Sequence, residues 1–304
     1  MSAATRPTSD LPLGVAIAAN PYSGRKQNRR RVEALATALR EAGLEPRLMW
    51  GRDELAAAAG DGNFANDYRA VVAAGGDGTL NRVINHPIAV PLAMFPLGNQ
   101  NLFARQFGHN DDPAAMAAMI AAGKSTTIDL GRAAGRLFSI VASAGFDGDA
   151  AHRLAHWRER KEGRLKRVRS LSYARPIIAS ACRYRYPLME VTADGRHMRG
   201  ALVMVFNLPQ YAADLPLAAD AVADDSLLDW LVFEKPGSLR LAGYALSVWL
   251  KRHRRRRDVF HGRARRIELS CPVPVPLEID GEAAGFAPLS IEVVPAALRV
   301  IVPE

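Results

Sequence analysis

Apolar runs and segments of helical periodicity alternate through the first part of the chain. Continuous apolar runs are typical of buried strands, and apolar residues three or four positions apart are typical of amphipathic helices. The strands predicted in this way cover residues 13–21, 45–50, 68–76 and 91–98, and the helices cover residues 28–44, 53–59, 78–85 and 112–123. Strands that alternate with helices predict a parallel sheet with helices on both faces, which is an α/β domain.

Beyond Ile128 the pattern changes to strand-like stretches separated by turn residues such as Asp194-Gly195. This pattern is typical of an antiparallel sheet or sandwich. The strand-like stretches are residues 136–145, 188–207, 227–235, 264–271 and 275–285, and one helical segment, residues 238–257, lies among them. A last stretch, residues 287–303, is expected to return to the first domain. We therefore predict an α/β domain over residues 11–128, completed by residues 288–304, and a β-rich domain over residues 129–287.

The composition agrees with two globular domains. The chain has 304 residues, of which 49% are hydrophobic and 23% are charged, so it can form sizeable cores. Cys182 and Cys271 are the only cysteines, too few for a disulfide framework and without the spacing of a metal site. The N-terminal residues lack the apolar region of a signal peptide, and no apolar run reaches the length of a membrane span. A cytoplasmic protein is expected.

The net charge of +9 is concentrated in two segments. Residues 158–169 carry seven basic and two acidic residues, and residues 251–266 carry nine basic residues and one acidic residue. These segments together carry +13, so the rest of the chain carries −4. The basicity is therefore local, as in a surface that binds an acidic partner.

Polar residues that suit phosphate binding first occur in the stretch NPYSGRKQ, where a predicted strand passes into a helix. Asn20, Ser23 and Gly24 are followed there by Arg25 and Lys26. Amide groups at a helix start point outward and, with basic side chains beside them, attract phosphate. Taken alone, this segment is better explained as an ordinary polar turn.

The stretch VVAAGGDGTLNRVIN places Gly75, Gly76, Asp77, Gly78 and Thr79 directly after an apolar run. Glycines let the backbone approach a ligand, a carboxylate can hold a metal ion, and a hydroxyl can donate to a phosphate. Neither the P-loop pattern nor the Gly-x-Gly-x-x-Gly fingerprint occurs here. A tight turn without ligand explains the stretch equally well.

The stretch FPLGNQNLFARQFG supplies Gly98, Asn99, Asn101 and Arg105 at the next predicted strand-to-helix junction. Loops that follow adjacent parallel strands converge at one edge of the sheet, so this loop and the glycine-rich loop are expected to face one ligand. An N-capped helix without ligand is the alternative.

The stretch EIDGEAAG contains Asp280 and Glu282, which would point to the same face of an extended strand. Two carboxylates there suit general-base or magnesium chemistry. The alternative is a hairpin turn at Asp280-Gly281.

In this order, the motifs NPYSG, GGDGT, PLGNQNLFAR and DGE resemble the diacylglycerol kinase catalytic-domain family, in particular its soluble bacterial lipid kinases, over nearly the whole chain. GGDGT is shared with NAD kinases and with sphingosine and ceramide kinases, whereas the third motif and the late DGE favour the lipid branch. The resemblance implies a two-domain ATP-dependent kinase with its active site in the cleft between an α/β nucleotide-binding domain and a β-rich domain.

The resemblance also implies roles for particular residues. Glu282 is its first choice of general base, Asp280 is the second carboxylate, and Asp77 would join Mg²⁺ to the phosphates of ATP. A structural magnesium site would take Asp225 and the carbonyls of Val222 and Leu227. The phosphate-binding positions are Asn20, Pro21, Tyr22, Ser23, Gly24, Gly75, Gly76, Asp77, Gly78, Thr79, Leu80 and Asn81.

The chain departs from the family pattern at three positions. Asn99 replaces a threonine and can still donate to a phosphate, whereas Leu102 replaces an acid and so weakens a metal network around Asp77. Ser226 stands where the family has glycine. A pseudoenzyme is the less favoured interpretation, because the three predicted catalytic carboxylates are all present.

Three classes of function therefore remain. A lipid kinase would phosphorylate a hydroxyl of a diacylglycerol-like lipid, an NAD kinase-like or sphingoid-base kinase would use another alcohol, and a noncatalytic relative would only bind lipid. The DGE motif favours the first class. The acceptor lipid is not indicated by any motif.

The second basic segment, WLKRHRRRR behind LAGYALSV, resembles an amphipathic interfacial element. A lipid substrate requires contact with a membrane, and anionic headgroups attract Lys and Arg. We rank peripheral contact with an anionic membrane first and a solvated charged face second. Nonspecific nucleic-acid binding ranks third, and no specific nucleic-acid partner is expected. The oligomeric state stays open, with a homodimer as one alternative.

Overall fold

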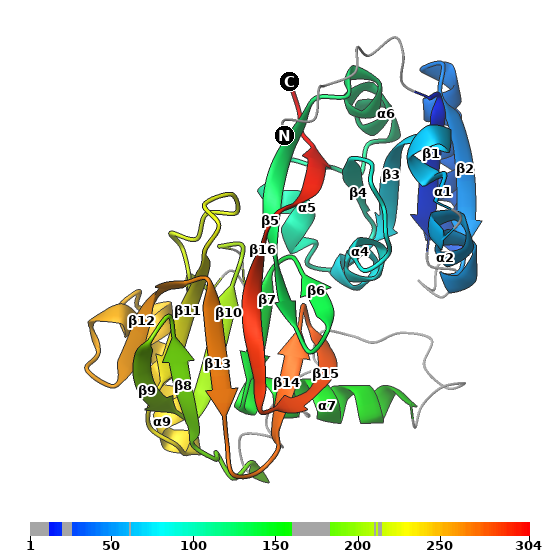
Figure 1. Cartoon of the computed structure of the whole chain (residues 1–304). Coiled ribbons are helices and arrows are strands. Elements are labelled where there is room, and N and C mark those ends of the chain that lie inside the picture. Colours follow the sequence, from blue (N-terminus) through cyan, green and yellow to red (C-terminus); the bar gives the residue numbers. More distant parts are fainter. Residues whose placement is uncertain (1–11, 20–25, 61, 160–182, 210, 212–214) are drawn as a thin grey trace. The chain divides into compact units, whose positions relative to one another are not determined.

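The computed structural model describes residues 12–19, 26–60, 62–159, 183–209, 211 and 215–304. The chain divides into two compact units (Figure 1). Unit 1 comprises Met1–Ile128 and Ala296–Glu304, and unit 2 comprises Asp129–Pro295.

Unit 1 is an α/β domain. Its elements are β1 (Gly14–Ala19), α1 (Lys26–Glu41), β2 (Glu45–Trp50), α2 (Arg52–Gly60), α3 (Phe64–Asp67), β3 (Tyr68–Gly75), α4 (Asp77–Ile84), β4 (Leu92–Pro96), α5 (Leu102–Gln106) and α6 (Pro113–Ala122). Its four strands pair in parallel in the order β2-β1-β3-β4, which confirms the predicted parallel sheet. Helix α6 begins as its sequence indicates, since Asp112 accepts a hydrogen bond from the amide of Ala114 and Pro113 occupies the first turn.

The core of unit 1 explains why its strands are continuous apolar runs. Strand β3 is buried at seven of its eight positions, because a parallel sheet is covered on both faces. Ile17 and Val72 from the sheet pack in one cluster with Leu35 and Leu39 from α1. The apolar spacing that predicted the helix is thus the stripe that α1 places against the sheet.

Unit 2 is β-rich. Its elements are β5 (Ser125–Ala133), β6 (Arg136–Phe138), β7 (Val141–Ala144), α7 (Phe146–Glu159), β8 (Met189–Ala193), β9 (Arg196–Gly200), β10 (Leu202–Phe206), β11 (Leu228–Phe233), α9 (Ser238–Trp249), a short 3-10 helix η4 (His253–Arg255), β12 (Val259–Ala264), β13 (Arg266–Ser270), β14 (Val275–Ile279), β15 (Glu282–Ala287) and β16 (Leu289–Ile301). Six strands pair antiparallel in the order β12-β11-β10-β7-β14-β15.

A second set of antiparallel strands, β16-β13-β8-β9, packs against the six-stranded sheet. Val191 and Ile267 of this set lie in one buried cluster with Val205, Trp230 and Leu277 of the six-stranded sheet. The predicted sandwich is confirmed. The turn at Asp194-Gly195 joins β8 and β9, with a left-handed backbone at both residues (φ 43° and 85°).

Strands β5 and β16 each belong to both units, and β5 begins at Ser125 in unit 1. The first residues of β16 pair with β13 of unit 2, and Val300 of β16 pairs with Leu92 of β4 in unit 1. The division falls between Pro295 and Ala296, so residues 288–295 belong to unit 2, although the sequence placed them in the first domain.

The predicted helix over residues 238–257 is too long. Helix α9 ends at Trp249, and Lys251 has a left-handed backbone (φ 55°) that separates it from η4. His253 is buried, and its Nε2 lies 3.0 Å from the carbonyl oxygen of Leu217. The basic run therefore does not continue α9, and part of it forms the separate short helix η4. In the part of the chain that the structure describes, no helix is long and apolar enough to cross a membrane.

Candidate active site

Two glycine-containing loops meet at the carboxyl edge of the sheet in unit 1. One joins β3, which ends at Gly75, to α4 through Gly76, and the other joins β4 to α5 and contains Gly98 and Asn101. The amide of Leu97 donates to the carbonyl of Gly75 at 2.9 Å. This contact confirms the expectation that the two loops lie together. They do so because their strands, β3 and β4, are neighbours in the sheet.

The closeness of the loops depends on glycine. A Cβ placed on Gly98 would lie 2.6 Å from the Cα of Gly76, a distance that real side chains do not reach. Asn101 fixes the second loop, since its Oδ1 accepts from the amide of Gly98 at 3.0 Å and its Nδ2 donates to the Gly98 carbonyl at 3.1 Å. It does so with a left-handed backbone (φ 49°), which asparagine tolerates better than most residues. The result is a narrow, backbone-lined junction.

Asp77 is the first residue of α4, and its side chain reaches toward the second loop. Its Oδ1 accepts a hydrogen bond of 3.3 Å from the amide of Phe103 in the first turn of α5. Thr79 is buried, and its amide and that of Leu80 donate to the carbonyl of Gly76 at 2.8 and 3.2 Å. An anion at this helix start would therefore be received by the amides that precede Thr79.

The remaining predicted phosphate-binding residues differ in what they can offer. Leu80 and Asn81 are buried, so the Leu80 side chain belongs to the core and the residue offers a ligand only backbone groups. Asn99 is exposed at the tip of the second loop. The five residues of the first motif, Asn20, Pro21, Tyr22, Ser23 and Gly24, lie outside the described residues.

In unit 2, the DGE motif forms the tight turn between β14 and β15. Asp280 and Gly281 both have a left-handed backbone (φ 46° and 84°), as in a two-residue hairpin turn. The expectation that Asp280 and Glu282 share a face of one strand is wrong, because the chain reverses between them. The hairpin alternative is the one that the structure has.

The two carboxylates of the motif have different surroundings. Asp280 is buried, and its oxygens accept hydrogen bonds from the amides of Ser139, Ile140 and Val141 at 2.9, 3.0 and 3.0 Å. The Ser139 hydroxyl lies 3.3 Å from the same carboxylate. Glu282 keeps 44% of its side chain exposed and faces the guanidinium of Arg136 at 3.4 Å. Asp280 thus holds the backbone that precedes β7, and Glu282 is the carboxylate of the motif that a substrate can reach.

A second group of buried carboxylates lies beside this turn and was missed from the sequence. The hydroxyl of Ser143 lies 2.8 Å from Glu278 and 3.1 Å from Asp147, and the Tyr211 hydroxyl donates to Asp147. Glu278 also accepts a hydrogen bond from the amide of Gly281, the middle residue of the DGE motif. An acidic residue inside the apolar run VPLEI was the available signal, since a buried strand rarely carries one without a partner.

The pKa values in this group are shifted upward. Burial raises the pKa of Asp147, against hydrogen bonds from Tyr211 and Ser143 that lower it. Burial, and then the charge of Asp147, raise the pKa of Glu278. A hydroxyl carries one proton and can donate to only one of the two carboxyl groups, so both contacts of Ser143 are satisfied when one carboxyl group is protonated. The pair therefore holds a proton more strongly than two solvated carboxylates would.

The predicted structural magnesium site does not fit the contacts around it. One oxygen of Asp225 accepts from the amide of Leu227 and the other binds Arg263, each at 3.0 Å. The guanidinium of Arg263 thus takes the place beside Asp225 that a metal ion would take. Val222 is exposed. Among the described residues, no group of three or more His, Cys, Asp or Glu side chains could hold a metal ion.

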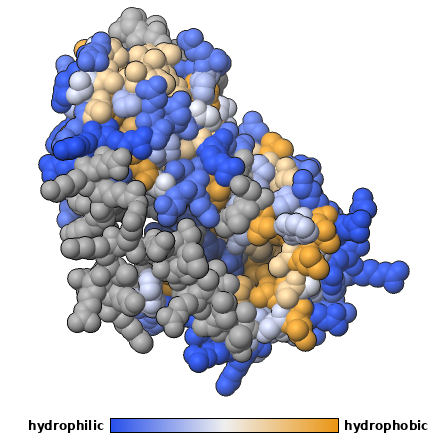
Figure 2. Space-filling model, turned by 180° about the vertical axis from the view of Figure 1, so that it is seen from behind, coloured by the Kyte–Doolittle hydropathy of each residue, from blue (hydrophilic) through white to orange (hydrophobic). Residues whose placement is uncertain are grey.

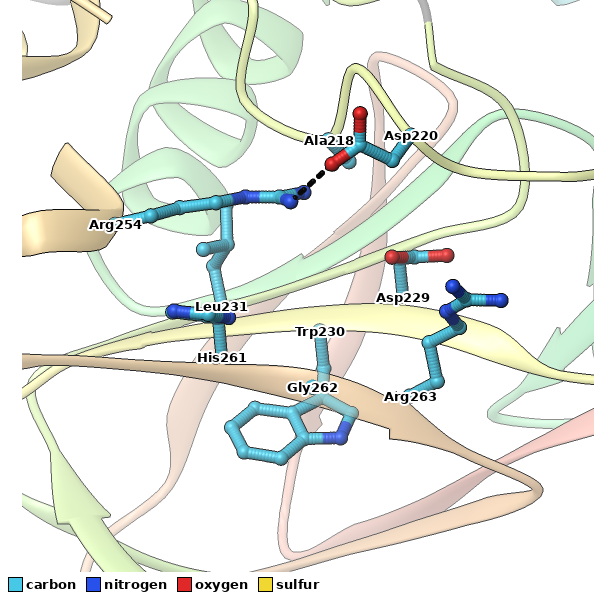
Figure 3. A pocket seen from close by; sticks show the side chains of 9 residues that line it. All are labelled: Ala218, Asp220, Asp229, Trp230, Leu231, Arg254, His261, Gly262 and Arg263. Carbon is cyan, nitrogen blue, oxygen red and sulfur yellow. Dashed lines mark hydrogen bonds and ion pairs between the residues drawn. The ribbon is translucent and has the colours of Figure 1, made fainter. Parts of the chain in front are cut away.

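A cavity of about 250 Å³ lies over β11 and β12 (Figure 3). It is lined by Ala218, Asp220, Asp229, Trp230, Leu231, Arg254, His261, Gly262 and Arg263. Burial raises the pKa of Asp229, against the charges of Arg263 and Arg254. In Figure 3, Arg254 extends to Asp220, with which it forms an ion pair of 2.6 Å, and Arg263 lies beside Asp229. None of the predicted catalytic, phosphate-binding or metal-binding residues lines this cavity.

Comparison with known families agrees with the site. Residues 14–133 match the diacylglycerol kinase catalytic domain, and residues 140–302 match the YegS C-terminal NAD kinase beta sandwich-like domain. The chain belongs to the diacylglycerol kinase catalytic-domain family. The two matches cover unit 1 with its glycine loops and unit 2 with its DGE hairpin.

Individual relatives agree with this assignment. A diacylglycerol kinase of Mycobacterium tuberculosis (strain H37Rv) is 29% identical over 249 residues, which are 77% of each chain. A diacylglycerol kinase of Bacillus subtilis (strain 168) is 24% identical over 299 residues, which are 94% of this chain and 95% of the relative. The crystal structure of a diacylglycerol kinase of Bacillus anthracis (strain Sterne) has the same fold, with a TM-score of 0.67 at 18% identity, over 97% of this chain and 98% of that one. The chain is therefore a lipid kinase relative with the two-domain fold of this family.

Proposed function

We propose that this protein is an ATP-dependent kinase that phosphorylates a hydroxyl group of diacylglycerol or of a related lipid. The observation that carries the proposal is the contact between the two glycine loops at the start of α4, where Gly76 and Gly98 approach within the space of one Cβ. A junction lined by backbone, with a helix start and a carboxylate in it, suits the polyphosphate of a nucleotide. The matches to diacylglycerol kinases support the lipid acceptor.

Each residue has a chemical role in this proposal. The amides at the start of α4 and the amide of Asn99 would bind phosphate oxygens, and Asp77 would hold the magnesium ion of Mg-ATP. A carboxylate can accept several bonds, so the bond from Phe103 does not exclude a cation. Magnesium would neutralise charge that develops on the phosphates during transfer.

Glu282 would act as the general base. Its carboxylate would take the proton of the acceptor hydroxyl while the oxygen of that group bonds to the γ-phosphorus, and the bond from the γ-phosphorus to the β-phosphate oxygen breaks to release ADP. The half-exposed position of Glu282 supports this role over Asp280, whose oxygens are occupied by backbone amides. A lipid acceptor also requires peripheral contact with a membrane, which is part of the proposal.

The test is phosphoryl transfer from γ-labelled Mg-ATP to dispersed lipid. The protein is incubated with diacylglycerol in mixed micelles, with a sphingoid base and with NAD in separate reactions. We expect label in diacylglycerol or in another lipid of a total extract, and loss of that label in Asp77→Asn and Glu282→Gln at unchanged thermal stability. Label in NAD alone, or ATP binding without transfer to any lipid, would overturn the lipid-kinase proposal.

A further inference from the structure

Helix α9 carries two apolar stripes, and only one of them is used by the fold. Tyr244 and Val248 are buried against unit 2. On the opposite side the side chains of Leu239, Leu246 and Trp249 are 90%, 57% and 68% exposed. We call the exposed side chains of Leu239, Ala242, Leu246, Trp249 and Leu250 the α9 face.

The α9 face is unusual for a helix on a protein surface. A surface helix ordinarily turns charged residues to the solvent, whereas α9 contains no acidic residue and one basic residue, Arg240. Seen from behind, in Figure 2, hydrophobic residues gather at the lower right, on the side where α9 lies, with hydrophilic residues beside them. An exposed apolar patch bordered by polar residues is typical of a surface that binds a partner or a membrane.

Several cations lie on α9 or shortly after it in the chain. Arg254 and Arg256 are neutralised by ion pairs with Asp220 and Asp258, at 2.6 and 2.9 Å. A second set of cations is exposed and forms no ion pair with the described residues: Arg240, Lys251, Arg252, Arg255 and Arg257. An apolar face and an excess of positive charge therefore lie together at this end of unit 2.

We propose that the α9 face is the surface by which this protein docks on a membrane of anionic lipids. The inference rests on the proposed function, because a lipid acceptor requires such contact. Leu and Trp side chains would enter the boundary between headgroups and acyl chains, while Lys and Arg bind lipid phosphates above it. A second copy of the chain fits less well, since a twofold interface would place the five cations of one copy against those of the other.

The test is binding to vesicles without nucleotide, so that it does not depend on catalysis. Sedimentation with vesicles of phosphatidylcholine and 30% phosphatidylglycerol is compared with pure phosphatidylcholine, in about 0.1 M and 0.5 M salt. We expect binding to the anionic vesicles that weakens with salt. Leu246→Asp should reduce the partition coefficient about tenfold or more. Arg252→Gln with Arg255→Gln should reduce it roughly thirtyfold, because each cation contributes about 1 kcal/mol.

Val273→Asp is the matched control, because Val273 is an exposed apolar residue of the same unit (48%) outside the α9 face. It should bind vesicles as the wild type does. Equal vesicle binding by Leu246→Asp and Val273→Asp would overturn the inference. If the protein is a dimer that only Leu246→Asp dissociates, and vesicle binding is unchanged, the α9 face binds a second copy of the chain. Transfer to lipid in mixed micelles is measured for the same variants, so that failure of the kinase proposal is seen separately from failure of the docking surface.

Discussion

Replacement of Asp280 by alanine tests whether the DGE motif contains one structural and one reactive carboxylate. The substitution removes the acceptor of three backbone amides, at 2.9, 3.0 and 3.0 Å, in a site where Asp280 is 8% exposed. A buried donor left without a partner costs about 1 to 3 kcal/mol. Water that enters the vacated space recovers part of this. We therefore expect Asp280→Ala to lower the free energy of unfolding by about 3 to 6 kcal/mol.

The assay is equilibrium unfolding in urea, with Glu282→Ala as the control. Glu282 is half-exposed, and its ion pair with Arg136 is of the kind that contributes about 0 to 1 kcal/mol, so the control should unfold nearly as the wild type does. Both variants are expected to lose kinase activity, but only Asp280→Ala should lose stability. A loss below about 1 kcal/mol in Asp280→Ala would refute the reasoning that this carboxylate holds residues 139–141.

Three further variants address the loops and the charged clusters. Gly98→Ala should weaken ATP binding about tenfold or more in calorimetry, because its Cβ forces the loop away from Gly76, and unchanged affinity would contradict a nucleotide at this junction. Glu278→Gln should gain stability relative to the wild type as the pH rises. Burial raises the pKa of Glu278 in the folded state. At pH values between the unfolded and the folded pKa, the folded wild type therefore binds more protons than the unfolded chain, and its stability falls as the pH rises. Melting curves from pH 4 to 8 would show this difference between wild type and variant. Chelation of divalent ions should leave the melting temperature of the wild type unchanged. Arg263→Gln should lower the melting temperature, because the guanidinium of Arg263 is the cation at Asp225. A wild type that is destabilised by chelation would favour a metal ion at Asp225.

The α/β part of the fold could be predicted because its strands are buried on both faces. Continuous apolar runs such as β3 and the helical spacing of Leu35 and Leu39 report this burial directly in the sequence. The end of α9 could not be predicted in the same way. Nothing in the run WLKRHRRRR opposes a continued helix, and the chain turns because His253 is buried against Leu217, a residue far away in sequence. The point at which β16 passes from one unit to the other depends likewise on its pairing partners.

The candidate site likewise has features that the sequence predicts and features that it does not predict. The convergence of the loops at Gly76 and Gly98 follows from the order of parallel strands, which alternation in the sequence predicts. The accessibility of each carboxylate could not be predicted from the sequence. The alternation of side chains along a strand indicates only on which face of the sheet each side chain lies. Asp280 lies in the turn, where the alternation of a strand no longer applies. The ion pair of Asp225 and Arg263 joins residues 38 positions apart in the sequence. Contacts of this kind are set by tertiary packing.

The stretch EIDGE shows how one hairpin gives three acids three different roles. Glu278 points into the buried group around Ser143 and accepts from the amide of Gly281, while Asp280 binds the amides of residues 139–141. The turn is thus held on both sides by buried carboxylates that already accept hydrogen bonds from the protein, and Glu282 follows it directly. A general base on a fixed turn needs little reorganisation before it accepts a proton. For this reason the two buried acids should be necessary for the rate without contacting the lipid, and their conservative variants should lower kcat more than they raise KM.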